Sequence, residues 1–249
     1  MTTPNGIILI DKPKGRSSMH VCANVRARLR KGGAPKRIKV GHAGTLDPMA
    51  TGLLVVMVGA ATRRCAELMA DEKEYETLID LAHRSTTDDA EGEITPVGVG
   101  PIDEPRVREV CARFVGVISQ RPPDFSAIHV GGRRAYAIAR EGKPVQIAPR
   151  DVFVKAIDVL EYAWPLLRVR VTCGKGVYIR SLARDVGASL GAGGMLRELR
   201  RTRAGALRVE DAKQLDDLPA AMTQADLTSE SEPRHGDGGG ANGPSVGEG

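Results

Sequence analysis

The sequence contains few aromatic residues, few cysteines and no long apolar run. Aromatic side chains make up 3% of the 249 residues, from one Trp, three Phe and four Tyr. Hydrophobic residues still make up 41% of the chain, so the core must consist of Val, Ile, Leu and Ala. Each exposed aromatic ring therefore needs a specific explanation. The composition excludes collagen-like, mostly disordered and disulfide-rich proteins.

The four cysteines, Cys22, Cys65, Cys111 and Cys173, lie far apart in the chain. They form no CxxC pair and no Cys/His cluster, so neither a zinc site nor a disulfide framework is predicted. We expect buried, reduced thiols. The longest apolar run, Leu53–Val58, is too short to cross a bilayer, and the N-terminus does not resemble a signal peptide. A soluble, cytoplasmic protein without membrane contact is expected.

Charge is distributed unevenly along the chain. Residues 1–64 carry 12 basic and 2 acidic groups, 65–111 carry 4 and 13, 112–205 carry 17 and 7, and 206–249 carry 3 and 9. Two basic segments separated by an acidic one can fold together into a positive surface that attracts phosphate groups. Ordinary solvated faces explain the same charges. The charge pattern alone therefore does not identify a partner.

The sequence contains no internal repeat, and no Pro/Gly/Ser-rich linker divides residues 6–225, so one compact domain over residues 1–225 is expected. The expected elements are strands at 6–10, 53–58, 73–83 and 167–173, and helices beginning near residue 17, over 60–69, over 104–114 and from the segment after 180 to about 190. They alternate irregularly, so we expect an α+β fold with a mixed, mostly antiparallel sheet flanked by helices. The glycine-rich residues 226–249 predict a disordered acidic tail.

The strongest candidate for chemistry is the loop Gly41–Gly52, which carries three glycines, Asp47 and Pro48 between two apolar strands. Glycine lets the backbone approach a ligand closely, and proline stiffens the turn after the carboxylate. An aspartate on such a loop can act as a nucleophile or a general base. An Asp-Pro turn is also a common structural device, so the loop alone does not establish a function.

Two further clusters have both a functional and a structural explanation. In Lys175–Arg180, an arginine at a helix start can pair with a carboxylate or a phosphate, or it can be a surface residue after a glycine turn. Tyr75 lies on a predicted strand, where cross-strand packing is its default role. The acidic segment 87–92 lacks the glutamate that ends a calcium loop, and the five histidines show no ligand spacing. No metal is expected.

Together, these clusters resemble the TruB family of tRNA pseudouridine synthases, which act on uridine-55 in the T-loop. The matching motifs occur in the family's order within roughly residues 6–210, and the one around Asp47 is the most specific. They are Gly6–Ser18, Gly41–Gly52, Lys73–Tyr75 and Lys175–Arg180, with a further match over 122–136. The resemblance implies a pseudouridine synthase fold, which is also α+β. It implies an RNA isomerase that detaches uracil from N1 and reattaches it through C5, with neither cofactor nor metal.

The resemblance also implies roles for residues of an active-site pocket. Asp47 matches the catalytic aspartate nucleophile. Tyr75 matches a tyrosine that stacks on the flipped base and is a candidate for taking the C5 proton. Arg180 matches the arginine that pairs with the aspartate, Tyr178 lies beside it, and Leu199 matches an apolar contact to the target nucleotide. A target uridine must leave its stack, and aromatic faces and arginine planes can receive it.

The resemblance further implies RNA-binding residues. His42 matches a residue that wedges into the T-loop, and Lys12 matches a lysine that supports the active-site loop. Arg133 and Arg134 belong to residues 122–143, which match a mobile loop that closes over the RNA. The implied partner is the T-loop and T-stem of tRNA, bound by a monomer.

The sequence departs from the family pattern in three places. Thr86 replaces a usual aspartate, and Phe125 and His129 stand near positions that usually carry Tyr and Lys. No C-terminal RNA-binding domain of the PUA type is evident after residue 225, which predicts weaker RNA binding or a partner that supplies the surface. Two alternatives stay open. One is an RNA-binding or tRNA-folding protein whose catalysis is incidental, and the other is a related synthase with a different RNA target.

Overall fold

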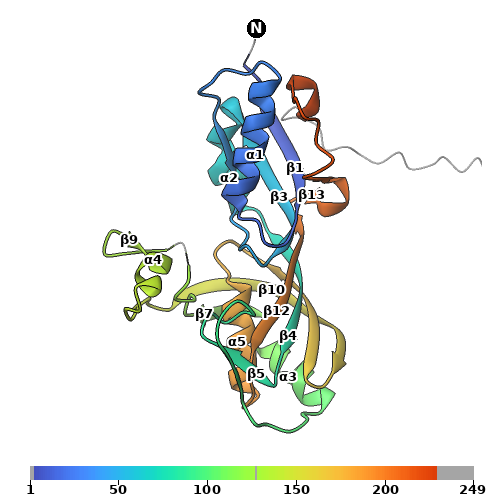
Figure 1. Cartoon of the computed structure of the whole chain (residues 1–249). Helices are drawn as coiled ribbons and strands as arrows, with labels where there is room; N and C mark the ends of the chain where they lie inside the picture. The colour runs from blue at the N-terminus through green and yellow to red at the C-terminus, as the bar shows by residue number, and fades with distance from the viewer. Residues whose placement is uncertain (1–2, 127, 229–249) are drawn as a thin grey trace, which may run out of the picture.

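The computed structural model describes residues 3–126 and 128–228. Within them, a single ten-stranded sheet runs through both lobes of the molecule (Figure 1). Its order is β14 (Lys213–Gln214), β1 (Gly6–Lys12), β3 (Thr51–Val58), β12 (Met195–Ala204), β4 (Lys73–Asp80), β11 (Leu166–Cys173), β10 (Arg150–Ala163) and β7 (Gly116–Gln120), with β2 (Val40–His42) beside β3 and β13 (Leu207–Arg208) beside β12. Two pairs, β1–β14 and β3–β12, are parallel, and the other pairs are antiparallel. The expected mixed, mostly antiparallel sheet is confirmed.

Helices pack beside both lobes of the sheet (Figure 1). Those of the β1–β3 lobe are α1 (Ser18–Lys31), the 3-10 helix η1 (Gly59–Arg64) and α2 (Cys65–Ala70), and those of the other lobe are α3 (Glu104–Arg113) and α5 (Ile179–Ser189). Helix α1 begins where predicted, because the Ser17 side chain accepts a hydrogen bond from the His20 N–H. Its buried face is formed by Val21, Val25 and Leu29, which recur at helical spacing.

Strand β3 explains the unbroken apolar run of the sequence. Leu54, Val56 and Val58 belong to the larger hydrophobic core, whereas the alternate residues Leu53, Val55 and Met57 belong to a second core on the opposite face. A strand covered on both faces needs apolar residues at every position rather than at every second one. The loop that carries Asp47 therefore leads directly into β3, in which every residue after Thr51 is buried.

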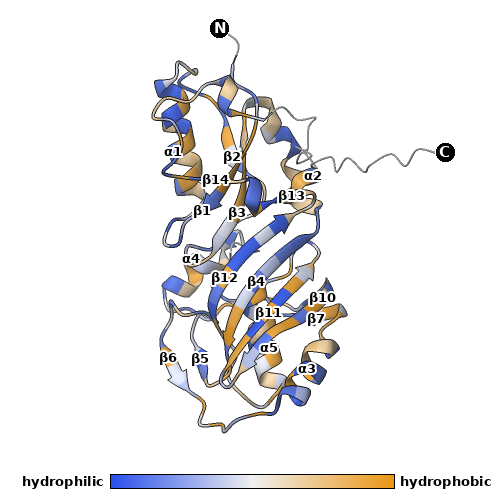
Figure 2. Ribbon diagram, turned by 90° about the vertical axis from the view of Figure 1, so that its right-hand side faces the viewer, coloured by the Kyte–Doolittle hydropathy of each residue, from blue (hydrophilic) through white to orange (hydrophobic). Residues whose placement is uncertain are grey.

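Strands β10 and β12 are the main elements that the sequence pattern does not predict. Strand β12 lies in the middle of the sheet, yet Figure 2 shows that it is largely hydrophilic. Its pairing register with β4 shifts at two bulges, which breaks the simple alternation of a strand. Three of its arginines are compensated by ion pairs with neighbouring elements, namely Arg197–Asp80, Arg200–Asp11 and Arg203–Glu72.

An arm formed by residues 121–149 leaves the sheet between β7 and β10 (Figure 1). It contains β8 (His129–Val130), β9 (Arg133–Arg134) and α4 (Ala135–Arg140). Ala135, Val145 and Ile147 form a small hydrophobic cluster of its own, apart from the two main cores. The arm therefore holds itself together and depends on its two ends for its position against the rest of the protein.

A second small sheet and two 3-10 helices complete the described chain: β5 (His83–Ser85) with β6 (Ile94–Pro96), η2 (Val209–Asp211) and η3 (Gln224–Asp226). The fold extends through Thr228, which pairs with Ile7, whereas the sequence predicts a tail from residue 226. Residues 229–249 of that predicted tail lie outside the described residues. In the described part, no helix has both the length and the apolar character needed to cross a membrane.

The four cysteines have free thiols, as expected. Cys22, Cys111 and Cys173 are buried, while Cys65 is only partly buried. Burial raises the pKa of Cys22 and Cys111 to about 11 and that of Cys173 to about 12. These three thiols stay protonated at neutral pH and serve as core residues.

Candidate active site

A cavity of about 220 Å³ lies where the loop after β2, strand β4 and the start of α5 meet. All five residues predicted for the pocket line it: Asp47, Tyr75, Tyr178, Arg180 and Leu199. A larger cavity of about 390 Å³ lies between β1, β13 and residues 225–228 and includes none of them. The five side chains therefore converge on the smaller of these two cavities, which makes it the candidate site.

The loop that carries Asp47 is fixed from below by α1 and β1. The Ser18 hydroxyl donates to the Leu46 carbonyl at 3.0 Å and accepts from the Leu46 N–H at 2.8 Å. The Lys12 ammonium is fully buried and donates to the Pro48 carbonyl at 3.3 Å, as well as to two carbonyls of its own turn. These bonds fix the backbone on both sides of Asp47, whose side chain stays about one-third exposed (34%).

Burial lowers the pKa of Lys12 to about 8, even though the nearby Asp47 carboxylate opposes this shift. Lys12 does not line the cavity. It lies under the active-site loop, where three carbonyl oxygens surround its ammonium group.

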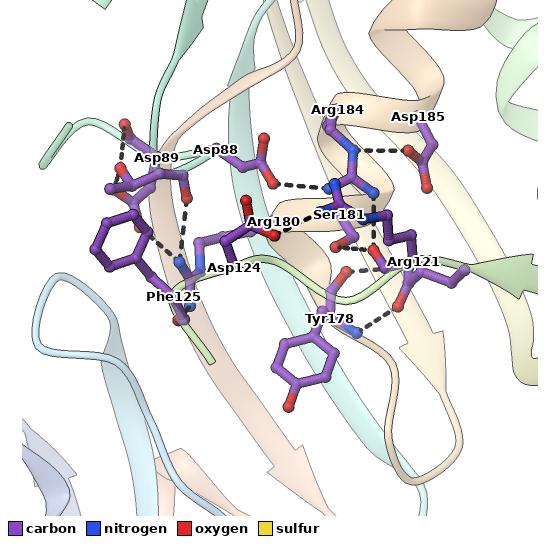
Figure 3. A network of polar contacts seen from close by, with 12 residues as sticks. Asp88, Asp89, Arg121, Asp124, Phe125, Tyr178, Arg180, Ser181, Arg184 and Asp185 are labelled. Atoms are coloured by element: carbon purple, nitrogen blue, oxygen red, sulfur yellow. Dashed lines mark hydrogen bonds and ion pairs between the residues drawn. The ribbon is translucent and has the colours of Figure 1, made fainter. Parts of the chain in front are cut away.

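Arg180 joins Asp47 to a second carboxylate, that of Asp89. Its Nε atom lies 2.9 Å from Asp47 Oδ2, and its Nη1 atom lies 3.3 Å from Asp89 Oδ2 (Figure 3 shows the Asp89 side of this contact). The Nε–Asp47 contact is an ion pair by distance, because the Nε–H is not aligned for a hydrogen bond. The side chains of Arg180 and Asp89 are 5% and 4% exposed. Of these three side chains, Asp47 is therefore the one that solvent or a ligand can reach.

Asp89 is a site residue that the sequence reasoning misses. Its Oδ1 atom accepts hydrogen bonds from the Thr87 hydroxyl and the Glu91 N–H, so the acidic segment 87–92 is a tight turn built around this carboxylate. The sequence pattern of this segment excludes a calcium loop and indicates no other role. The acidic segment is visible in the sequence, but the buried ion pair between Asp89 and Arg180 joins residues far apart in the chain and has no local signature.

Arg201 is a second missed residue, and its side chain is only 1% exposed. Its Nε donates to the Leu53 carbonyl at 2.7 Å and its Nη2 to the Gly44 carbonyl at 3.1 Å, so one guanidinium ties together both ends of the loop that carries Asp47. It also lines the cavity beside Tyr75. The available signal was the Arg200–Arg201 pair, because two successive arginines on one strand point to opposite faces.

Tyr75 lies on β4 and packs against the main core. Burial raises the pKa of its hydroxyl, although the charge of Arg201 opposes the shift. The phenol is therefore neutral at physiological pH and is suited to stacking and hydrogen bonding. Removal of a proton by this residue would require the phenolate form, which burial disfavours.

Tyr178 is held by a reciprocal pair of hydrogen bonds just before α5. Its N–H donates to Gln120 Oε1 at 2.8 Å, and its carbonyl accepts from Gln120 Nε2 at 3.2 Å. The Arg150 guanidinium lies 5.4 Å from the centre of the tyrosine ring, within cation–π range. Strands β7 and β10 thus jointly position this cavity wall.

Three of the predicted RNA-binding residues, Lys12, His42 and Arg133, lie outside the cavity wall. His42 is on β2, and its Nδ1 atom is buried without a hydrogen-bond partner among the described residues. Burial, aided by the charge of Arg201, lowers the pKa of His42, so the imidazole is neutral. Arg133 is exposed on the arm and forms an ion pair with Glu141. The side chain of Arg134 lies outside the described part of the protein.

The three residues that depart from the family pattern, Thr86, Phe125 and His129, have different surroundings. The Thr86 hydroxyl accepts a hydrogen bond from the Glu93 N–H at 3.1 Å, so it closes the acidic turn. The Phe125 carbonyl accepts from Arg180 Nη2 at 2.9 Å, and a backbone contact of this kind needs no particular side chain. His129 is exposed on β8.

Across residues 3–126 and 128–228, no group of three or more His, Cys, Asp or Glu side chains is placed to hold a metal ion.

Comparison with known proteins identifies the family. The model for the N-terminal domain of TruB family pseudouridylate synthases matches residues 31–179, and that for the C-terminal domain of tRNA pseudouridylate synthase B matches residues 180–235. The chain belongs to the TruB family of pseudouridine synthases. A relative named tRNA pseudouridine synthase B, from Thermobifida fusca, is 48% identical over 88% of this chain and 76% of its own length. One of the same name from Bifidobacterium longum is 41% identical over 84% of this chain and 65% of its own length.

Solved structures give the same family fold. The structure of a Cbf5-Nop10-Gar1 complex contains a chain with a TM-score of 0.65 and 33% identity, covering 86% of this TruB protein and 53% of that chain. An H/ACA RNP bound to a substrate RNA containing 2′-deoxyuridine gives a TM-score of 0.63 at 31% identity, over 86% and 52%. The TruB protein thus spans about half the length of these chains. The expected pseudouridine synthase fold is confirmed.

Proposed function

We propose that this TruB protein is a tRNA pseudouridine synthase that converts uridine-55 of the T-loop into pseudouridine. The observation that carries the proposal is a carboxylate, Asp47, that stays partly exposed in a cavity while a buried arginine holds it. The names of the relatives support tRNA as the substrate. The position of the target uridine rests on the resemblance of the motif around Asp47 to that of the family.

In the proposed reaction, Asp47 acts as the nucleophile that allows the bond between C1′ and N1 of uridine to break. The uracil turns, C5 bonds to C1′, the C5 proton leaves, and N1 takes up a proton. The reaction is an isomerisation, so no external oxidant, reductant or group donor is needed. Arg180 balances the charge of Asp47 and fixes its orientation, as preorganised catalysis requires.

The flipped base would enter the cavity between Tyr75 and Leu199, which both line it. The neutral phenol of Tyr75 offers a face for stacking and a hydroxyl for hydrogen bonding. Its raised pKa argues against Tyr75 as a ready base for the C5 proton. The proposal therefore assigns stacking to Tyr75 and leaves the C5 proton to a group that is ionised at neutral pH.

In a monomer, the proposed RNA-binding surface includes the cavity, the arm and the residues next to the loop that carries Asp47. Arg133 is an exposed arginine of the arm, and Arg134 is its neighbour in β9; these two are the proposed phosphate contacts. His42 stands next to the Asp47 loop as a neutral, half-buried ring, which suits it to wedge between RNA bases. Lys12 supports the loop from inside rather than binding phosphate, because its ammonium group is fully buried.

The test uses unmodified tRNA transcripts and chemical mapping of pseudouridine. We expect product at position 55 alone, and none in a transcript that carries cytidine there. Product at another position, or only in a different RNA, would favour a related synthase. If the wild-type protein accelerates tRNA refolding without forming pseudouridine, it is instead an RNA-folding protein that uses the basic segments 1–64 and 112–205.

A further inference from the structure

The arm is attached to the same helix that carries Arg180. On its outgoing side, Gln120 binds the backbone of Tyr178, and the Phe125 carbonyl accepts from Arg180. On its returning side, Arg150 donates to the Gly176 carbonyl at 2.9 Å. Both ends of the arm are thus fixed to the short segment that leads into α5 and to the first turn of this helix.

The hinge of the arm, at Arg121, has an additional attachment (Figure 3), and Arg121 does not line the cavity. The Arg121 carbonyl accepts hydrogen bonds from the Ser181 hydroxyl at 2.9 Å and from Arg184 Nη2 at 2.8 Å. The Arg184 guanidinium is itself held by Asp88 at 2.9 Å and by Asp185 at 2.9 Å. All three directions of this guanidinium are therefore occupied, and one of them ends on the hinge.

Asp88 occupies an unusual backbone position. Its φ angle is +62°, in the left-handed region that residues other than glycine rarely adopt. Its backbone is fixed by hydrogen bonds to Ser85 and to Leu196 of the central strand β12. In this conformation the side chains of two successive residues both reach helix α5. Asp88 binds Arg184, and Asp89 binds Arg180.

Arg180 and Arg184 are four residues apart, so they lie one turn apart on the same face of α5. In the first turn of the helix, Arg180 contacts the carboxylates of Asp47 and Asp89. In the next turn, Arg184 contacts Asp88 and Asp185 and donates to the hinge. Because Asp88 and Asp89 are adjacent, the same turn positions the carboxylate that binds Arg184 and the carboxylate that binds Arg180. Hydrogen bonds and ion pairs therefore connect the Arg121 carbonyl, through Arg184 and the acidic turn, to Arg180.

We propose that Asp88 and Arg184 are positioning residues that set the hinge of the arm relative to the Asp47–Arg180 pair. Neither residue lines the cavity, and neither is needed to hold the base. The effect on catalysis rests on the proposed function, because it requires that the arm contacts the RNA. The effect on the arm itself does not depend on that function.

The first experiment measures the arm without any RNA. Trypsin can cleave the arm after the exposed residues Arg133 and Arg140. We expect Asp88→Asn and Arg184→Gln to accelerate cleavage in the arm about tenfold, as expected when a charge-assisted hydrogen bond is lost. Asparagine tolerates a left-handed φ, so Asp88→Asn changes the charge and keeps the turn.

The matched control is Arg108→Gln, which removes another arginine from an ion pair in the same lobe, on α3. It should leave cleavage of the arm unchanged. Ser181→Ala removes the other donor to the Arg121 carbonyl and should accelerate cleavage less than Arg184→Gln does. Cleavage at the wild-type rate in both Asp88→Asn and Arg184→Gln would overturn the proposal, and so would acceleration spread evenly over the whole molecule.

The second experiment measures steady-state kinetics with unmodified tRNA. We expect the KM for tRNA to rise about tenfold in Arg184→Gln and in Asp88→Asn, with a smaller change in kcat. The double variant should be no worse than Arg184→Gln, because both changes remove one linkage. Additive losses, or an unchanged KM, would contradict the positioning role. If the wild type itself forms no pseudouridine while the proteolysis result holds, the proposed function fails and the hinge assignment stands.

Discussion

The Nε atom of Arg180 lies 2.9 Å from Oδ2 of Asp47, and the same guanidinium binds the buried carboxylate of Asp89. Asp89 and the acidic turn fix the arginine, and the arginine in turn orients the exposed aspartate. Catalytic groups are most effective when their positions are set before the substrate binds. In this protein the position of Arg180 is set by an acidic turn whose Asp89 does not line the cavity.

The first prediction concerns that linkage. Arg180→Lys cannot hold two carboxylates in the same geometry, because an ammonium group lacks the planar fork of a guanidinium. We expect kcat to fall about a hundredfold or more, as for misplaced catalytic groups. Asp89→Asn keeps the shape of the turn and weakens only the charge pair, so its loss should be smaller. Single-turnover measurement of pseudouridine separates these losses from RNA binding. Equal activity of Arg180→Lys and wild type would contradict this account.

A second prediction concerns the stability contributed by Lys12. Its pKa in the folded protein is about 8, below the ordinary value of 10.5, because it is buried. Below pH 8 both the folded and the unfolded chain hold the proton, and the folded state bears the cost of burying the charge. Between about pH 8 and 10.5 the unfolded chain binds more protons, so the free energy of unfolding rises with pH.

The measurement compares urea unfolding of the wild type with that of Lys12→Met across this window. The wild type should gain about 2–3 kcal/mol relative to Lys12→Met between pH 8 and 10.5. Other titrating groups are shared by the two proteins and cancel in the difference. A constant difference across the window would show that Lys12 keeps an ordinary pKa.

The third prediction concerns Arg201, whose guanidinium ties Gly44 to Leu53. Arg201→Met removes the donors to both carbonyls, so the loop that carries Asp47 loses its closure. We expect kcat to fall about a hundredfold, with a smaller loss for Arg201→Lys, which keeps the charge but not the fork. Arg200→Gln is the matched control, since Arg200 pairs with Asp11 outside the cavity. Equal losses in Arg200→Gln and Arg201→Met would remove the special role of Arg201.

The fourth prediction separates the ring of Tyr75 from its hydroxyl. Tyr75→Phe keeps the stacking face, so the dissociation constant for tRNA should stay within about threefold of the wild-type value. Because burial raises the pKa of Tyr75, the pH profile of kcat should show no ionisation of this phenol near neutrality. An ionisation between pH 7 and 9 that disappears in Tyr75→Phe would assign the proton transfer to Tyr75 after all.

The sequence predicts elements with a regular apolar pattern better than it predicts strand β12. Helix α1 and strand β3 follow from hydrophobic spacing alone, because each buries a regular apolar face or two apolar faces. Strand β12 does not, because its arginines are compensated by carboxylates on other elements and its alternation is broken by bulges. Such partners are distant in sequence, so local pattern cannot reveal them.

The candidate site divides in the same way. Asp47, Tyr75 and Arg180 lie in recognisable motifs, and the structure brings them to one cavity. Asp89 and Arg201 act through contacts with residues about 90 and 150 positions away in sequence, and neither contact has a local signature. The acidic turn and the arginine pair were visible in the sequence, but only the fold shows what they bind.

The most direct test of the central claim compares the wild type with Asp47→Asn in a single-turnover reaction with unmodified tRNA. Asparagine keeps the size and the turn of Asp47 but cannot act as a nucleophile. We predict that the wild type forms pseudouridine at position 55, and that Asp47→Asn forms none while binding tRNA and unfolding as the wild type does. Pseudouridine formed by Asp47→Asn at the wild-type rate would contradict the account.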